Sequence, residues 1–203
     1  YNLNKNAKIL IFKKEKETIG KMLERFEKEE ETKNYLEKLG FDKETLKVFN
    51  SWKMDLDPYN LVMMKSETLD EGTIKIGSSE FNVIWTPGHT PGHMCLLHNS
   101  SNKIICGDHI LKNITPNISF LYEENNLLDY FRSLDKVKNI DPDLILPGHN
   151  GFIKNVKERI EELRKHHVER LDEVLRILEN KEMNLYEIAS RMKWSSKNDF
   201  MKM

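Results

Sequence analysis

The chain has 203 residues, of which 38% are hydrophobic and 32% are charged, and this suits one good-sized domain, or one domain with a small appendage. A membrane-spanning helix needs about 20 apolar residues in a row, and the sequence contains no such run. The 32 basic and 33 acidic side chains nearly balance, so bulk attraction to nucleic acid or to an acidic membrane does not organise this protein.

The two cysteines, Cys95 and Cys106, both lie in apolar runs. This placement is typical of reduced core residues in a cytoplasmic protein. The chain opens with Tyr1 rather than Met, and we therefore expect it to be a fragment of a longer protein.

The first part of the chain, residues 13–47, is dense in Lys and Glu. Its apolar residues keep helical spacing before the stop signal Gly40, and they are Ile19, Met22, Leu23, Phe26, Leu36 and Leu39. The pattern predicts surface helices with a narrow apolar stripe, and it favours a solvated helical face over an interaction tail.

The middle of the chain alternates strand signals with one helix signal, and residues 81–102 carry no charge. A turn is expected at Gly77-Ser78-Ser79, and a helix over Asn126–Lys138. Short β-rich runs predict strands, at Ile9–Phe12, Thr73–Ile76, Phe81–Trp85, Met94–Leu97, Lys103–Cys106 and Asp143–Leu146. This mixture predicts a layered α/β or α+β domain.

The last part, residues 156–203, is predicted to be helical. One apolar stripe steps by three or four residues, through Ile160, Leu163, His167, Leu171, Val174 and Leu178. Asn184 has Glu187 three positions later, the pattern of a capping box that starts a further helix.

Three of the predicted strands run into short loops that hold a side chain able to bind a metal. These side chains are His89 and His149, each after Pro-Gly, and Asp108, after Gly107. Rigid strand ends deliver ligands accurately, and Pro and Gly turn the chain sharply. A single Pro-Gly-His could be an ordinary turn, but the repetition favours a metal site. Imidazole with carboxylate suits zinc, iron or manganese rather than calcium.

The same motifs resemble the later half of the metallo-β-lactamase superfamily signature. They are Thr86-Pro87-Gly88-His89-Thr90-Pro91-Gly92-His93, Gly107-Asp108-His109 and Leu146-Pro147-Gly148-His149, within a resemblance that covers Lys8 to about Ile153. The resemblance implies an αββα sandwich with two metal ions, expected to be zinc. It implies that His89 ligates one ion, that the catalytic Asp108 bridges both, and that His149 ligates the other. His93 would support these ligands from nearby.

One part of the family signature is missing. The motif His-x-His-x-Asp-His, which supplies the remaining ligands in the family, does not occur here, and the paired His166 and His167 lie on a predicted helix. We expect residues 1–155 to be the later part of the sandwich and residues 156–203 to be a helical, winged-helix-like domain. We also expect weak or no metal binding and no activity from this chain alone. A paralogue that lost its metal is the alternative.

The resemblance implies hydrolysis by metal-activated water of an ester, thioester, lactone, amide or phosphodiester bond in a small molecule. Two segments resemble a branch of the superfamily with an extra C-terminal helical domain: Ile114-Thr115-Pro116-Asn117-Ile118, and His166-His167-x-x-Arg170-Leu171 in the tail. That branch includes glyoxalase-II-like hydrolases and β-lactamase-like endoribonucleases. RNA or DNA contact through the tail is therefore the alternative function, although the basic residues there are few. A membrane partner is not expected, whereas a homodimer would cover the exposed face of a half-sandwich.

Overall fold

The computed structural model describes residues 7–26, 29–42, 57–119, 125–179 and 181–194. The chain forms two compact units, one from residues 1–21 with Tyr59–Lys165 and one from Met22–Pro58 with residues 166–203. The divisions between the units fall inside three helices, α1 (Lys13–Phe26), α4 (Asp57–Lys65) and α6 (Val156–Ile177).

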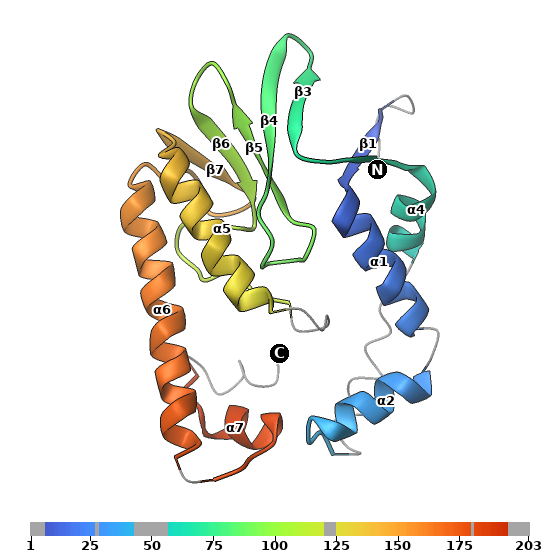
Figure 1. Ribbon diagram of the computed structural model, residues 1–203, viewed down its shortest axis with the longest axis vertical. Coiled ribbons are helices and arrows are strands. Elements are labelled where there is room, and N and C mark those ends of the chain that lie inside the picture. Colours follow the sequence, from blue (N-terminus) through green and yellow to red (C-terminus); the bar gives the residue numbers. More distant parts are fainter. Residues whose placement is uncertain (1–6, 27–28, 43–56, 120–124, 180, 195–203) are drawn as a thin grey trace. The chain divides into compact units, whose positions relative to one another are not determined.

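The first unit contains a five-stranded sheet in which the strands follow one another in chain order (Figure 1). Neighbouring strands are antiparallel except for the last pair, β6 and β7, which is parallel. The strands are β3 (Gly72–Ile76), β4 (Ser79–Trp85), β5 (Met94–His98), β6 (Lys103–Gly107) and β7 (Leu144–Pro147). Every strand predicted for this region is present, and only its end residues differ.

The turn between β3 and β4 is the predicted hairpin. Ile76 pairs with Ser79, which leaves Gly77 and Ser78 as a two-residue loop. Gly77 has a φ of 61°, a backbone conformation that glycine adopts without steric cost. The Gly-Ser-Ser signal therefore fixes the register of the first strand pair.

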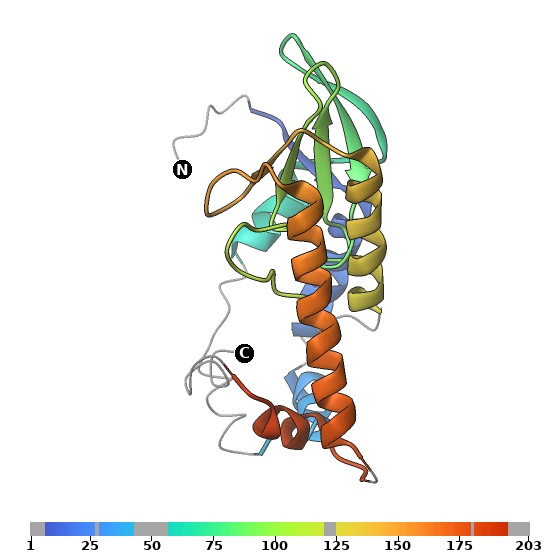
Figure 2. The ribbon, with the colours of Figure 1, turned by 90° about the vertical axis from the view of Figure 1, so that its left-hand side faces the viewer.

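One face of the sheet is covered by α5 (Asn126–Ile140) and by the first half of α6 (Figure 2). Side chains alternate along β6, so that Ile104 and Cys106 are fully buried while Ile105 is 41% exposed. The buried set is one apolar cluster, formed by Cys95, Ile104, Cys106, Ile110, Tyr130, Leu134, Val137, Ile145, Ile153, Val156, Ile160 and Leu163. Cys95 and Cys106 form no disulfide, as the sequence indicated. Burial raises the pKa of Cys106 to about 12 and also raises the pKa of Cys95, so both thiols stay protonated.

A two-stranded parallel sheet also lies in the first unit. β1 (Ile9–Phe12) pairs with β2 (Ser66–Leu69), which follows α4 (Asp57–Lys65). The sequence predicted β1 at these bounds but missed α4 and β2. Only one residue of β2, Ser66, is buried, so this strand lacks the alternation of apolar and polar residues by which strands are recognised.

The second unit contains α2 (Glu29–Lys38), the second half of α6 and α7 (Leu185–Arg191). Asn184 accepts a hydrogen bond from the Glu187 N–H, and the Glu187 carboxylate accepts one from the Asn184 N–H, so the predicted capping box is present. The predicted apolar stripe of α6 is only partly buried, because Leu171 is 43% exposed. None of the helices in the described ranges combines the length and the apolar character that a bilayer crossing requires.

Candidate metal centre

The three candidate ligands lie at one edge of the five-stranded sheet. β4 and β6 run in the same direction because each is antiparallel to β5, and β7 is parallel to β6. The carboxyl ends of these three strands therefore meet at the same edge. His89, Asp108 and His149 follow those ends, each in a loop after a strand, where the sequence predicted it.

Asp108 lies between the two histidines. Its Oδ2 is 4.0 Å from His89 Nε2, and its Oδ1 is 3.4 Å from His149 Nε2. The side chains of His89 and Asp108 are 27% and 32% exposed, whereas that of His149 is 65% exposed. One carboxylate oxygen thus faces each imidazole.

The hydrogen bond made by His89 determines which of its nitrogens is free. Its Nδ1 lies 2.7 Å from the carbonyl oxygen of Asn117. A carbonyl oxygen can only accept, so Nδ1 carries the proton and donates it. Nε2 then faces Asp108 and is the nitrogen left for ligation, which is the arrangement that metal-ligating histidines use.

The loop Thr86–His93, which carries His89, is fixed by its neighbours on two sides. On the first side, Ser133 of α5 donates a hydrogen bond of 2.8 Å to the Pro87 carbonyl. A Cβ added at Gly88 would lie 2.5 Å from Tyr130 Cβ, so α5 packs directly on the glycine backbone. This close approach explains why glycine precedes His89.

On its other side the same loop contacts the start of α1. Glu15 Oε2 accepts hydrogen bonds from Thr90 Oγ1 at 2.7 Å and from the Gly92 N–H at 2.8 Å. Sequence reasoning missed Glu15. It lies among many similar charged residues and 75 positions before Thr90, so no local signal marks it.

His93 and His109 lie behind the candidate ligands. The His93 ring is 6.0 Å from that of His89 and 5.7 Å from that of His109, centroid to centroid. His93 Nδ1 is 2.9 Å from Thr86 Oγ1. Burial, and secondarily the neighbouring His89, lowers the pKa of His93 to about 4, so the ring is neutral at pH 7. This position suits the predicted supporting role of His93.

His109 is completely buried, and sequence reasoning assigned it no role. Neither ring nitrogen has a hydrogen-bond partner among the described residues. Burial, and secondarily the neighbouring His93, lowers the pKa of His109 to about 3. Its backbone carbonyl accepts a hydrogen bond of 3.0 Å from Tyr130 Oη, which ties the residue after Asp108 to α5.

The donor set fits part of a metal centre. Two ligand atoms about 2.1 Å from one tetrahedral zinc ion are about 3.4 Å apart, which is the distance between His149 Nε2 and Asp108 Oδ1. Gly148 leaves room for this approach, because a Cβ there would lie 2.7 Å from Asp108 Oδ1. Within the described part of the chain, however, no three His, Cys, Asp or Glu side chains group closely enough to hold an ion. The residues fit a metal as a partial ligand set.

The chain belongs to the metallo-beta-lactamase superfamily, whose family model matches residues 25–149, more than half of the sequence. Among curated proteins it is 28% identical, over 63% of this chain, to the probable metallo-hydrolase YqjP of Bacillus subtilis. It is 27% identical, over 55% of this chain, to an atrochrysone carboxyl ACP thioesterase of Aspergillus fumigatus. The matched regions are 42% and 34% of those two proteins, so the chain spans less than half of each.

Two solved structures share the fold. A beta-lactamase domain protein from Burkholderia ambifaria is 33% identical, with a TM-score of 0.59 over 65% of this chain and 44% of that one. The metallo-beta-lactamase family protein TTHA1429 from Thermus thermophilus has a TM-score of 0.62 over 90% of this chain and 60% of that one, at 22% identity. The predicted superfamily and the mixed α/β fold class are therefore confirmed.

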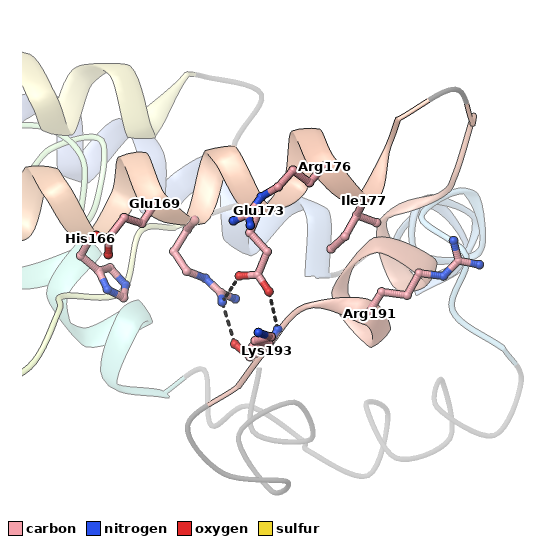
Figure 3. Close-up of a pocket in the computed structure, with 8 residues that line it drawn as sticks. His166, Glu169, Glu173, Arg176, Ile177, Arg191 and Lys193 are labelled. Atoms are coloured by element: carbon pink, nitrogen blue, oxygen red, sulfur yellow. Dashed lines mark hydrogen bonds and ion pairs between the residues drawn. The ribbon is translucent and has the colours of Figure 1, made fainter.

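A separate pocket of about 540 Å³ lies in the second unit (Figure 3). Arg170 is neutralised there by Glu173 at 2.7 Å, and Glu173 also accepts a hydrogen bond of 2.6 Å from the Lys193 N–H. His166 lies at one end of the pocket and Arg191 at the other. The lining carries four Arg and Lys side chains against two Glu, and consists of His166, Glu169, Arg170, Glu173, Arg176, Ile177, Arg191 and Lys193.

Proposed function

We propose that this chain carries the later part of the active site of a metal-dependent hydrolase. The observation that supports the proposal is the position of Asp108 between two imidazole Nε2 atoms, one of which is freed for ligation by the Asn117 carbonyl. His89, Asp108 and His149 would hold zinc, and iron or manganese would suit the same donors. Superfamily membership supports a hydrolytic reaction.

Bound metal would lower the pKa of a water molecule toward neutrality and polarise the bond to be cleaved. The protein contributes the positions of the ligands. The Asn117 carbonyl orients His89, Gly148 allows His149 to approach Asp108, and the buried neutral His93 adds no positive charge beside the metal. A thioester is the substrate class we test first, because one relative is named a thioesterase.

Three ligands are too few for a two-metal site. We propose that the remaining ligands come from a His-x-His-x-Asp-His motif within about 30 residues upstream of Tyr1, a loop-scale distance. The parent gene tests this directly. A start codon at the position of Tyr1, with no such motif before it, would contradict the proposal.

The decisive experiment compares metal content and thioester hydrolysis for this chain and for the longer protein. We expect two zinc ions and turnover only in the longer protein, and both should be lost in Asp108→Ala and His89→Ala. His98→Ala is the matched control, because His98 bonds Ser101 at the end of β5 and should keep both. Two zinc ions and full activity in the short chain would show that the ligand assignment is wrong.

The pocket of the second unit favours a second candidate function, nucleic-acid binding. Arg176 and Arg191 are both exposed. Glu173 pairs with Arg170, but the lining as a whole still carries a net positive charge, to which Arg176 and Arg191 contribute. Cationic side chains in a groove bind phosphates in a salt-dependent way.

Fluorescence anisotropy with a single-stranded RNA oligonucleotide tests this candidate. If the pocket binds RNA, the double substitution Arg176→Ala and Arg191→Ala should weaken binding. It should also reduce the slope of log affinity against log salt by about 0.7 for each lost phosphate contact. Lys75→Ala with Lys103→Ala, in the first unit, is the control. Equal binding by both double variants would exclude the pocket.

A further inference from the structure

The contact between α1 and the loop Thr86–His93 has a geometry that points to a specific task. Both hydrogen bonds from the loop end on the same carboxylate oxygen, Glu15 Oε2. Hydrogen bonds to a charged acceptor are about twice as strong as neutral ones. The two donors, Thr90 Oγ1 and the Gly92 N–H, both lie between His89 and His93 in the chain.

The glycine at position 92 is required by the same contact. A Cβ added there would lie 2.0 Å from the backbone nitrogen of Glu15 and 2.2 Å from its Cα. Backbone atoms cannot move aside as the end of a flexible side chain can, so a side chain at this position would push the loop away from α1. Gly92 therefore brings the loop close enough for its N–H to reach Glu15.

Aromatic packing holds the two segments together next to this point. Phe12, at the end of β1, stacks on Trp85 with ring planes 12° apart and centroids 6.1 Å apart. Trp85 Nε1 donates a hydrogen bond of 2.9 Å to the Pro91 carbonyl. Because α1 begins at Lys13, directly after Phe12, this packing delivers Glu15 to the loop.

We infer that Glu15 is a positioning residue for the metal centre, which fixes the loop carrying His89 and His93 by binding Thr90 and Gly92 through one carboxylate oxygen. Glu15 touches neither metal nor substrate in this role. It acts through the loop, and its link to the metal rests on the proposed function of His89. The loop is thus fixed on one side by α5 at Gly88 and on the other by α1 at Gly92.

Because one oxygen of Glu15 accepts both bonds, substitutions of Glu15 should differ in how well they keep the loop in place. A Gln carbonyl oxygen has two lone pairs and can accept both bonds, so Glu15→Gln should keep the loop in place. Glu15→Ala removes the acceptor, and Glu15→Asp shortens the side chain by one methylene and withdraws it. Glu15 also lies in the first turn of α1, where a negative charge stabilises the helix. Gln and Ala both lose that charge, so their comparison isolates the hydrogen bonds.

Amide hydrogen exchange followed by NMR on the 203-residue chain tests the inference without any metal. We expect the Gly92 N–H to exchange about tenfold faster in Glu15→Ala and by a clearly smaller factor in Glu15→Gln, which keeps the acceptor oxygen but loses its charge. The control Glu17→Ala, at an exposed position of the same helix, should leave it unchanged. The Ile145 N–H, bonded to the Ile153 carbonyl in the core, is the internal reference for global unfolding. Unchanged Gly92 exchange in Glu15→Ala, or equal acceleration in Glu15→Gln, would overturn the inference.

Zinc titration of the longer protein is the second measurement. We expect Glu15→Ala to weaken zinc binding by about 10-fold to 100-fold, the effect typical of residues that orient ligands, and Glu15→Gln to retain it. If Gly92 exchange changes while zinc affinity does not, the link between Glu15 and the metal is wrong. If the wild-type protein binds no zinc while exchange still depends on Glu15, the proposed function fails instead.

Discussion

The two loops that carry the histidines differ in how the protein holds them. The loop Thr86–His93 is bound from α1 by Glu15 and from α5 by Ser133. In the described part of the chain, the loop after β7 is held through its backbone alone, by a bond of 2.8 Å from the Gly148 N–H to the Gly107 carbonyl at the end of β6, and its His149 side chain is 65% exposed. Packing and side-chain hydrogen bonds therefore preorganise His89, whereas the exposed His149 is held in place only by the backbone of its loop.

The largest difference between the two loops should be the stability lost when a glycine in each is replaced by Ala. Gly88 and Gly151 both have positive φ, 142° and 79°, so Ala is strained at either position. Gly88 also contacts Tyr130, whereas nothing lies within 4 Å of a Cβ at Gly151. We expect Gly88→Ala to lower the free energy of unfolding by about 3 kcal/mol and Gly151→Ala by about 1 kcal/mol. Urea unfolding measures both, and equal losses would contradict the comparison.

Zinc binding should rank the two histidines in the same order. In the longer protein, truncating His89 removes a ligand whose orientation is already fixed, whereas His149 must lose side-chain freedom when it binds. We expect His89→Ala to weaken zinc affinity about tenfold more than His149→Ala does. Competition with a chelating dye measures both constants. A larger loss for His149→Ala would show that preorganisation of the first loop does not matter to the metal.

The pH dependence of stability should depend on the first loop. The pKa of His93 falls from 6.5 to about 4 on folding, so the unfolded chain binds this proton more readily. Protonation of His93 therefore does not lower the free energy of unfolding above pH 6.5. As the pH falls from 6.5 toward 4, it lowers this free energy by no more than about 1.4 kcal/mol per pH unit. His93→Gln should reduce the slope of stability against pH in the metal-free chain without removing it, because His109, whose pKa falls to about 3, contributes a slope of its own over the same range. Thr90→Val, in the same loop without a titrating group, should keep the slope.

The smallest effect should be found at Asn150, beside His149. Asn150 has a φ of 67°, a conformation that Asn and Gly tolerate better than other residues. We expect Asn150→Gly to change stability by less than about 0.5 kcal/mol and Asn150→Ala to cost about 1 kcal/mol. Thermal unfolding of the two variants is sufficient. A large loss for Asn150→Gly would mean that the Asn side chain, rather than the backbone turn, holds this loop.

The sequence predicted the parts of the fold that local patterns encode. The five strands of the main sheet and the capping box at Asn184 were found because apolar runs, turn residues and a polar cap are each contained in a short window. The strand β2 was missed because its partner is β1, far away in the chain, and its own residues Ser66-Glu67-Thr68-Leu69 carry almost no hydrophobic pattern. Leu171 shows the opposite error. It fits the helical spacing of apolar residues, but its side chain is exposed.

The candidate site divides in the same way. His89, Asp108 and His149 were predicted because each follows a strand-like run, and the strands bring them to one edge. The residues that hold the loop of His89 in place could not be predicted, because they contact it only in the folded structure. Glu15 is separated from Gly92 by 77 positions, and Ser133 from Pro87 by 46. Spacing within a motif carries no information about such partners.

The parallel pairing of β1 with β2 has a consequence for the order of folding. The hairpins β3–β4 and β4–β5 close short loops, whereas Ile9 must find Ser66 across most of the first third of the chain. Distant pairings lose more chain entropy before they gain contacts. We expect the β3–β4–β5 meander to gain protection early in refolding, and the β1–β2 ladder, together with the bond from Gly92 to Glu15, to gain it late. Pulsed hydrogen exchange would resolve the two phases, and the loop bearing His89 would reach its final position only in the second.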